Sequence, residues 1–335
     1  MVHIKTVNAS NSLIKDLPSG LVAAFIGATS GIGEEALRQF TQYATSPKIY
    51  IVGRSASSAA PLISQLKQSN PEATIEFVEK NVSLLRDIDA FTSYIKSKEQ
   101  KLDILMMSAG FISFVGRDKT SEGLDASMST RYYGRMRAIE NLLPLLRAAP
   151  SARVVSILAA GQEGKLIEDD LDLRKAGNYS IGNAATATGT MGTLTLGHFA
   201  TENPGISFVH AFPGFVATNN LTTKGSSGLV GLLLRLILPP IRWLFAISPK
   251  EAGARVLSYA TSARYAVAGG ESTSVPLATG LERAKQMDNR VFLVGGDGES
   301  VGKQALLNDC KSRGVDDAVW AWTQKVFSTL TAAAP

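Results

Sequence analysis

Short apolar runs alternate with longer amphipathic stretches along most of the chain. Apolar runs typical of buried strands lie at residues 21–28, 48–54, 102–110, 152–158 and 206–214, an alternating run lies at 74–82, and a last strand is predicted at 290–299. Helical spacing predicts helices at 31–43, 58–70, 85–98, 123–149 and 178–200. Strands alternating with helices predict an α/β fold, a parallel sheet with helices on both faces. No linker or internal repeat interrupts this order, so one domain over residues 1–335 is expected.

Composition and charge describe an ordinary globular protein. Hydrophobic residues make up 45% of the chain and charged residues 19%. The net charge of +5 comes from interspersed residues with no run of five like charges, so we expect no nucleic-acid partner. The single cysteine, Cys310, cannot form an internal disulfide and suits a reducing compartment, here the cytoplasm. The three histidines have no metal-ligand spacing, so no metal site is expected.

The most apolar stretch, residues 228–247, does not have the pattern of a membrane span. It contains Arg235 and Arg242 and is interrupted by Pro239 and Pro240, whereas a spanning helix needs roughly 20 apolar residues with few charges. We expect a lid over the substrate at about residues 219–250, with peripheral membrane contact left open. An apolar lid suggests a hydrophobic small-molecule substrate.

A glycine-rich turn follows the first predicted strand. In "GATSGIGEEAL", Gly27, Gly31 and Gly33 form G-x-x-x-G-x-G where a strand meets a helix. Glycines let the backbone approach a pyrophosphate, and the helix N-terminus offers free N–H groups. The second predicted strand ends at Arg54, where a cation suits the 2′-phosphate of NADP(H) and a carboxylate would favour NAD. A tight turn without a ligand and a solvated surface arginine remain the alternatives.

These residues, in this order, resemble the short-chain dehydrogenase/reductase family, nearest to its retinol-dehydrogenase-like members. The glycine turn, "LDILMMSAG", "RVVSILAAGQEGKLIEDDL" and the Pro-Gly of "FPGFVAT" carry the resemblance over about residues 20 to 300. It implies a Rossmann-type doubly wound parallel sheet, a bound nicotinamide cofactor and a small-molecule substrate. The cofactor residues expected are Gly27, Ser30, Gly31, Ile32, Gly33, Arg54, Asn81, Ala109, Gly110, Pro213, Gly214, Val216 and Thr218.

The family's catalytic Asn-Ser-Tyr-Lys set is altered at every position. The asparagine position of "STRYYGRM" holds Arg131, and the serine position falls on Leu158 or Ala159. If Tyr179 is the family's tyrosine, the lysine position holds Asn183. In the second register, which we favour, the tyrosine and lysine positions hold Ala185 and Gly189; the chain has no lysine between residues 175 and 224.

Loss of the lysine removes the charge that, in the family, lowers the pKa of the tyrosine. A free tyrosine has a pKa of about 10 and seldom releases its proton near neutrality. Arg131 is a fixed cation that could hold an enolate or oxyanion, and the carboxylates of Glu168, Asp169 and Asp170 could act as a base. We therefore expect Arg131, Tyr179, Asp169 and Asp170 to be catalytic. A helix-surface ion pair, a packing aromatic and a solvated or capping loop remain their alternatives.

Three functions are compatible with these residues. The first is an NADP(H)-dependent oxidoreductase acting on a hydrophobic ketone or alcohol, and the second is a redox-neutral cyclase or isomerase on the same scaffold. The third is a non-catalytic cofactor-binding protein. "LIEDDLDL" and "ISFVHAFPG" are similar to dehydrogenase-derived proteins of fungal natural-product pathways, which implies a role in secondary-metabolite biosynthesis. The oligomeric state is not predicted.

Overall fold

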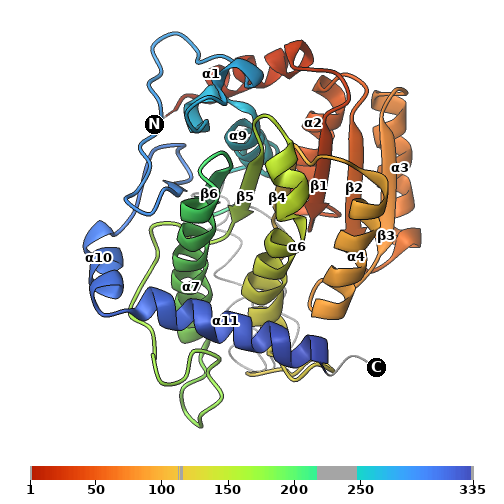
Figure 1. Ribbon diagram of the computed structural model, residues 1–335. Coiled ribbons are helices and arrows are strands. Elements are labelled where there is room, and N and C mark those ends of the chain that lie inside the picture. The colour runs from red at the N-terminus through yellow and green to blue at the C-terminus, as the bar shows by residue number, and fades with distance from the viewer. Residues whose placement is uncertain (1, 112, 114–115, 217–246, 333–335) are drawn as a thin grey trace, which may run out of the picture.

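A seven-stranded parallel sheet forms the centre of the computed structural model, which describes residues 2–111, 113, 116–216 and 247–332 (Figure 1). The strand order is β3-β2-β1-β4-β5-β6-β7, and every neighbouring pair is parallel. The strands are β1 Val22–Ile26, β2 Lys48–Gly53, β3 Thr74–Glu79, β4 Ile104–Met107, β5 Arg153–Ile157, β6 Ser207–Ala211 and β7 Phe292–Val294. All seven lie within the predicted ranges, so the prediction of a doubly wound parallel sheet is confirmed.

Helices cover both faces of the sheet because its strands are buried on both sides. Ala24 and Ile26 of β1 pack into a core with the helices α4, α6, α7 and α11, whereas Ala23 and Phe25 pack into a second core with α2, α3 and α9. The bounds are α1 Ile4–Ser12, α2 Gly31–Tyr43, α3 Ala56–Ser69, α4 Leu85–Lys98, α6 Gly134–Ala148, α7 Ile181–Glu202, α9 Pro249–Thr261, α10 Gln304–Ser312 and α11 Val315–Ala332.

Two helix predictions need correction. The helix predicted at 178–200 begins at Ile181, because the Ser180 side chain accepts a hydrogen bond from the Asn183 amide and caps it. The single helix predicted at 123–149 consists of α5 (Ala126–Met128), a π-helical turn at Ser129–Tyr133 and α6. Helices α1, α10 and α11 were not predicted. Most of the predicted lid, residues 219–250, lies outside the described residues.

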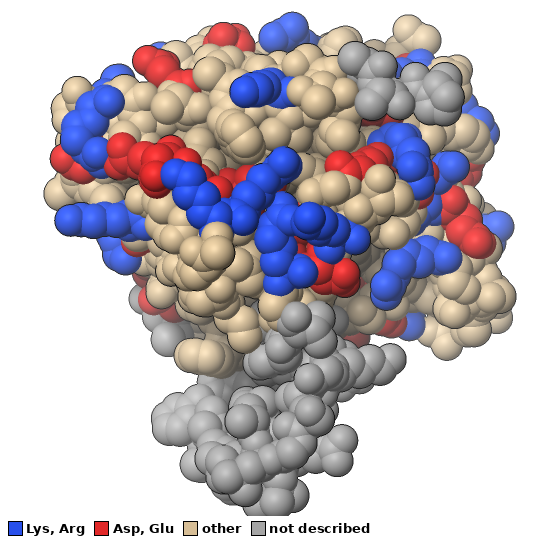
Figure 2. Space-filling model, turned by 90° about the horizontal axis from the view of Figure 1, so that it is seen from below, with Lys and Arg blue, Asp and Glu red and all other residues tan. Residues whose placement is uncertain are grey.

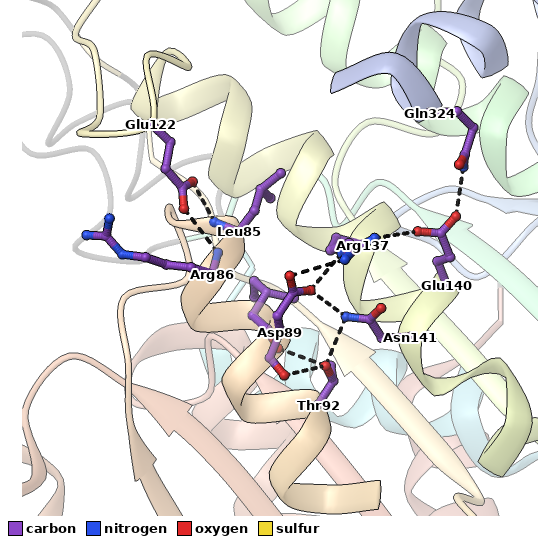
Figure 3. A network of polar contacts seen from close by, with 10 residues as sticks. Leu85, Arg86, Asp89, Thr92, Glu122, Arg137, Glu140, Asn141 and Gln324 are labelled. Atoms are coloured by element: carbon purple, nitrogen blue, oxygen red, sulfur yellow. Dashed lines mark hydrogen bonds and ion pairs between the residues drawn. The ribbon is translucent and has the colours of Figure 1, made fainter. Parts of the chain in front are cut away.

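A polar network joins α4, α6 and α11 over one face of the sheet (Figure 3). Arg137 of α6 donates from Nε and Nη2 to the Asp89 carboxylate of α4, at 2.6 and 3.1 Å. Asn141 also donates to Asp89, and Gln324 of α11 donates to Glu140 of α6. Charge-assisted bonds of this kind fix the relative positions of helices that apolar packing alone would let slide.

Removal of the Asp89 carboxylate is expected to destabilise this junction. Asp89→Ala leaves Arg137 and Asn141 without an acceptor that both use. The free energy of unfolding should fall by about 1–2 kcal/mol, measured by urea denaturation, because the lost bonds involve charged groups at a half-buried site. Asp288→Ala, at an exposed position, should change it by less than ~0.5 kcal/mol. Equal unfolding free energies for the two variants would show that the network adds no stability.

The described residues give information on membrane spans, metal clusters and surface charge. Within the described residues, no helix is long and apolar enough to cross a membrane. The same residues contain no cluster of histidine, cysteine and carboxylate side chains that could hold a metal ion. On the face that Figure 2 shows, basic side chains lie next to acidic ones, so surface charge is mixed there.

Candidate functional site

The glycine turn between β1 and α2 brings the chain unusually close to the end of β4. Gly27 has a φ of +93°, and a Cβ added there would lie 2.2 Å from the backbone nitrogen of Ala109. A Cβ on Gly33 would lie 2.2 Å from the hydroxyl of Ser108, which donates a 2.8 Å hydrogen bond to the Gly27 carbonyl. The turn is therefore built to a spacing that only glycine permits.

The first turn of α2 is free to bind an anion. Ser30 precedes the helix in extended conformation, and its side chain makes no capping hydrogen bond. Gly31 begins the helix with a φ of +65°. The first amides of α2 thus have no intrahelical acceptor, and the helix dipole adds partial positive charge. These features fit a dinucleotide diphosphate, as the sequence predicts.

Arg54 and Asn81 lie on the β2–β3 side of this turn. Arg54 directly follows β2 and is exposed, and among the described residues no carboxylate pairs with it. The Asn81 side-chain oxygen accepts from the backbone amide and the hydroxyl of Ser83, so it shapes the loop after β3. Arg54 is therefore available to a ligand, whereas Asn81 has a local structural partner.

An open cleft of about 310 Å³ runs from the α2 N-terminus to the carboxyl ends of β4, β5 and β6. It brings together the predicted residues Ser30, Ile32, Gly33, Gly110, Arg131, Pro213, Gly214 and Val216. Gly27, Gly31 and Ala109 belong to the adjoining turn and strand end. Thr218 lies outside the described residues. Apolar side chains that include Phe111, Leu158 and the 73%-exposed Phe215 form much of the remaining wall.

Arg131 enters this cleft from the π-helical turn. A π-turn inserts an extra residue into a helix and often marks a functional position. Tyr132 and Tyr133, the next residues, are fully buried and anchored: the Tyr132 hydroxyl contacts Thr195 of α7 and Thr323 of α11, and Trp322 of α11 donates to the Tyr133 hydroxyl at 2.8 Å. Contacts with α7 and α11 therefore hold the turn, and they fix the backbone that carries the Arg131 side chain.

The Arg131 side chain lies over Gly110 without a fixed partner. Its Cγ is 3.4 Å from the position of a Cβ on Gly110, and no described residue accepts a hydrogen bond from its guanidinium. Burial lowers the pKa of Arg131, while the charges of Tyr179 and Asp125 raise it. Both oxygens of Asp125 accept backbone amides, from Met128 and Asp118. The Arg131 guanidinium is thus free to bind a ligand, as the sequence analysis requires.

Tyr179 lies near Arg131 but not in the wall of the cleft. Burial raises the pKa of Tyr179 to about 12, helped by the charge and hydrogen bonding of Asp125, while Arg131 and Arg117 act in the opposite direction. The phenol therefore keeps its proton near neutrality more firmly than a free tyrosine does. In the structure it is a poorer proton relay than the family's tyrosine.

The positions of the missing serine and lysine favour the second register. Asn183 is exposed, and its side-chain amide donates to the Asn178 carbonyl, so it points away from the cleft's strand ends. Gly189 is buried, and a Cβ there would lie 3.2 Å from the Cβ of Ala159, two residues after β5. Small residues thus close the space between α7 and the strand end.

The expected catalytic roles of Asp169 and Asp170 are not supported by their positions. Asp169 is exposed and pairs with Lys175. Asp170 accepts from the backbone amides of Arg174 and Lys175 and from the side chain of Asn178, so it organises its own loop. Neither carboxylate lines the cleft. The loop alternative describes Asp170 better, because its acceptor capacity is used within its own loop and it caps no described helix.

Sequence reasoning missed Arg135, a second guanidinium in the cleft. Arg135 follows Arg131 by four residues, a spacing that places side chains on one helix face and could have revealed it. It is 1% exposed, and burial first and Arg131 second lower its pKa to about 9. An arginine in this state still carries its charge near neutrality.

A buried polar chain behind the strand ends was also missed. His210 of β6 accepts from the Ala159 amide at Nε2, and its Nδ1 lies 2.8 Å from the hydroxyl of Thr193, which donates to Glu163. Burial lowers the pKa of His210 to about 3, so the ring is neutral. A neutral ring that accepts at Nε2 carries its proton on Nδ1, which orders the chain toward Glu163.

Comparison with known proteins places this fold and cleft in a family. The family model for short chain dehydrogenases matches residues 21–168. The NmrA-like family domain-containing oxidoreductase notO of Aspergillus sp. (strain MF297-2) is 45% identical, over 99% of this chain and 97% of the relative. Oxidoreductase AN1596 of Emericella nidulans is 38% identical, over 98% of each.

Solved structures share the fold at low identity. Levodione reductase superimposes with a TM-score of 0.56 at 19% identity, over 78% of this chain and 97% of that one. The Pseudomonas aeruginosa RhlG/NADP active-site complex does so with a TM-score of 0.54 at 19% identity, over 78% and 96%. With the glycine turn, the strand order and the family model in agreement, the chain belongs to the short-chain dehydrogenase family.

Proposed function

We propose that the protein is an oxidoreductase that binds NADP(H) and acts on a hydrophobic small molecule. One observation carries the proposal: a single cleft joins the uncapped glycine turn of α2 to an apolar wall that contains a free arginine. The relatives named oxidoreductase in Aspergillus and Emericella support the reaction class. The similarity of "LIEDDLDL" and "ISFVHAFPG" to fungal pathway proteins supports a role in secondary metabolism. A buried lone cysteine, Cys310, supports a cytoplasmic location.

The residues that would hold the cofactor lie along the carboxyl edge of the sheet, in one group after β1 and another after β2. The α2 amides would bind the diphosphate, and Arg54 would bind the 2′-phosphate on the β2 side. The nicotinamide half then extends over the ends of β4 and β5, because a dinucleotide bridges the point where strand order reverses. When bound, NADP(H) supplies or accepts a hydride. Arg131 would stabilise negative charge that develops on the substrate oxygen.

NADPH is expected to bind more tightly than NADH, and Arg54→Asp is expected to remove that preference. The substitution deletes a charge-assisted hydrogen bond and adds repulsion, so NADPH affinity should fall by about 1–3 kcal/mol, roughly 5- to 150-fold. Fluorescence or calorimetric titration of both cofactors measures the change. Lys67→Asp, on the last turn of α3, makes the same change in net charge and should leave both affinities unaltered. Equal wild-type affinities for NADH and NADPH would refute the preference.

A redox-neutral reaction is the second candidate. The observation that favours it is the raised pKa of Tyr179 together with the missing lysine, since proton delivery to an alkoxide typically contributes 10² to 10⁴-fold in rate. A cyclisation or isomerisation through an enolate needs charge stabilisation from Arg131 and no hydride. Oxidation of one NADPH for each substrate consumed supports the oxidoreductase, whereas conversion at constant NADPH absorbance supports the second candidate.

A further inference from the structure

Two guanidiniums line the same end of the cleft, and one of them is fixed in the protein interior. Arg135 donates from Nη1 to the Ser156 hydroxyl and the Ile157 carbonyl, at 2.8 and 2.9 Å, and from Nη2 to the Ala109 carbonyl at 2.6 Å. These bonds tie its charge between the carboxyl ends of β4 and β5. Its Nε is buried and has no hydrogen-bond partner in the described protein.

No described carboxylate forms an ion pair with either cation: the charge of Asp125 raises the pKa of Arg131, but the two Asp125 oxygens accept backbone amides instead. Two other arginines with little exposure do have an acidic partner: Arg117 pairs with Asp172 at 3.0 Å, and Arg255 pairs with Glu251 at 2.8 Å. Arg131 and Arg135 form no ion pair with any described residue. The undescribed positions, which are 1, 112, 114–115, 217–246 and 333–335, contain no aspartate or glutamate in the sequence.

An unneutralised charge in an apolar cleft is costly unless a ligand balances it. Phe111, Leu158 and Phe212 line the same cleft, and their apolar surface lowers the local dielectric constant. Isolated charges in such surroundings carry a large desolvation cost, and like charges repel each other there. The carbonyl and hydroxyl partners of Arg135 satisfy its hydrogen bonds but leave its net charge in place.

We propose that Arg131 and Arg135 make this end of the cleft an anion-selecting site, which takes an apolar molecule bearing a carboxylate or enolate and favours the uncharged, reduced nicotinamide over the oxidised ring. The part that concerns nicotinamide rests on the proposed NADP(H) binding. Arg131 would contact the ligand next to Gly110, and Arg135 supplies a charge that its hydrogen bonds fix between the ends of β4 and β5. Their combined field opposes the positive charge of NADP⁺ and attracts an anion.

The chain provides a matched control in Arg153. This arginine is 2% exposed, lies at the opposite end of β5, and donates to the Tyr265 carbonyl and the Ser274 hydroxyl, both at 2.6 Å. Arg153→Met therefore removes a buried arginine with similar partners, far from the carboxyl edge of the sheet. Any effect shared by Arg135→Met and Arg153→Met reflects stability and not the cleft.

The first experiment compares the dissociation constants of NADP⁺ and NADPH by calorimetry. In the wild type we expect the ratio of the two constants to favour NADPH. Arg131→Met and Arg135→Met should each reduce that ratio by about tenfold, the effect of one unit charge several ångströms away at an effective dielectric constant near 20. Arg135→Lys and Arg153→Met should leave the ratio near that of the wild type. If Arg135→Met does not fold, Arg131→Met alone decides the outcome.

The second experiment needs no cofactor, so it separates this inference from the proposed function. Octanoate and octanamide are titrated into the cofactor-free protein, and octanoate is expected to bind at least about tenfold more tightly. Arg131→Met should abolish the difference, whereas Arg54→Asp should keep it, which excludes binding at the adenosine side. Equal affinity for the two probes, or loss of the difference in Arg54→Asp but not in Arg131→Met, overturns the inference. Absence of NADP(H) binding would refute the proposed function and leave this result intact.

Discussion

Replacement of Arg131 by alanine is expected to lower turnover by roughly 10² to 10³-fold, the loss seen when one preorganised oxyanion donor is removed. Arg131 lines the cleft, and no described residue accepts a hydrogen bond from its guanidinium. The hydrogen bonds of Tyr132 and Tyr133 hold the backbone of its π-turn in place. Whether the reaction is a reduction or a cyclisation, negative charge must develop on the substrate oxygen. The measurement is kcat with the natural substrate once it is identified.

A lysine at position 131 distinguishes charge from geometry. Arg131→Lys keeps the positive charge but loses the planar fork that binds an oxygen pair, so activity should fall only in part. NADPH affinity should hardly change in either variant, because the reduced ring carries no charge. Wild-type turnover in Arg131→Ala, or its failure to fold, would show instead that Arg131 has a surface or structural role.

Replacement of Gly27 by alanine is expected to abolish NADPH binding and to destabilise the fold by about 2–5 kcal/mol. The left-handed backbone costs about 1–2 kcal/mol for a residue with a Cβ, and overpacking adds about 1–3 kcal/mol. The clash is with the backbone nitrogen of Ala109, at 2.2 Å. That backbone cannot move freely, because Ala109 donates to the Ile26 carbonyl and accepts from Arg135.

Gly20→Ala isolates the two contributions. Gly20 has a φ of +76°, and nothing lies within 4 Å of a Cβ added there. The variant should therefore show the backbone cost alone, a loss of about 1–2 kcal/mol in urea denaturation, with NADPH binding intact. If both variants lose similar stability and both retain NADPH binding, the close approach of the glycine turn to β4 is not required for binding.

The sheet could be predicted because buried parallel strands leave continuous apolar runs. The core of β1 and the glycine turn after it are both local features, so the sequence alone locates them. Helices α10 and α11 were not predicted. Their apolar residues belong to the same core as α7, and local residue spacing does not reveal such long-range packing. The local motifs supplied most of the residues that we expected to bind the cofactor, and several of them line one cleft in the structure.

The catalytic side was harder to predict because it depends on which groups are already engaged. Asp170 is a carboxylate in a suitable loop, but three donors from residues 174 to 178 use it. Arg135 appears as one arginine in an arginine-rich helix, and only the meeting of two strand ends beneath it gives its charge a role. Composition and spacing record the presence of a charge, whereas its partners decide its function.

The anchoring of the π-turn by α11 has a consequence for how the protein is made. Tyr132 and Thr323 are separated by 191 residues, and Tyr133 and Trp322 by 189. At roughly 5–20 residues per second of synthesis, the turn emerges about 10–40 s before its partners exist. During that interval the Tyr132 contact with Thr195 of α7 can form, but the contacts of Tyr132 and Tyr133 with α11 cannot. The glycine turn proposed to bind the nucleotide is therefore synthesised well before the helix that anchors the turn carrying Arg131.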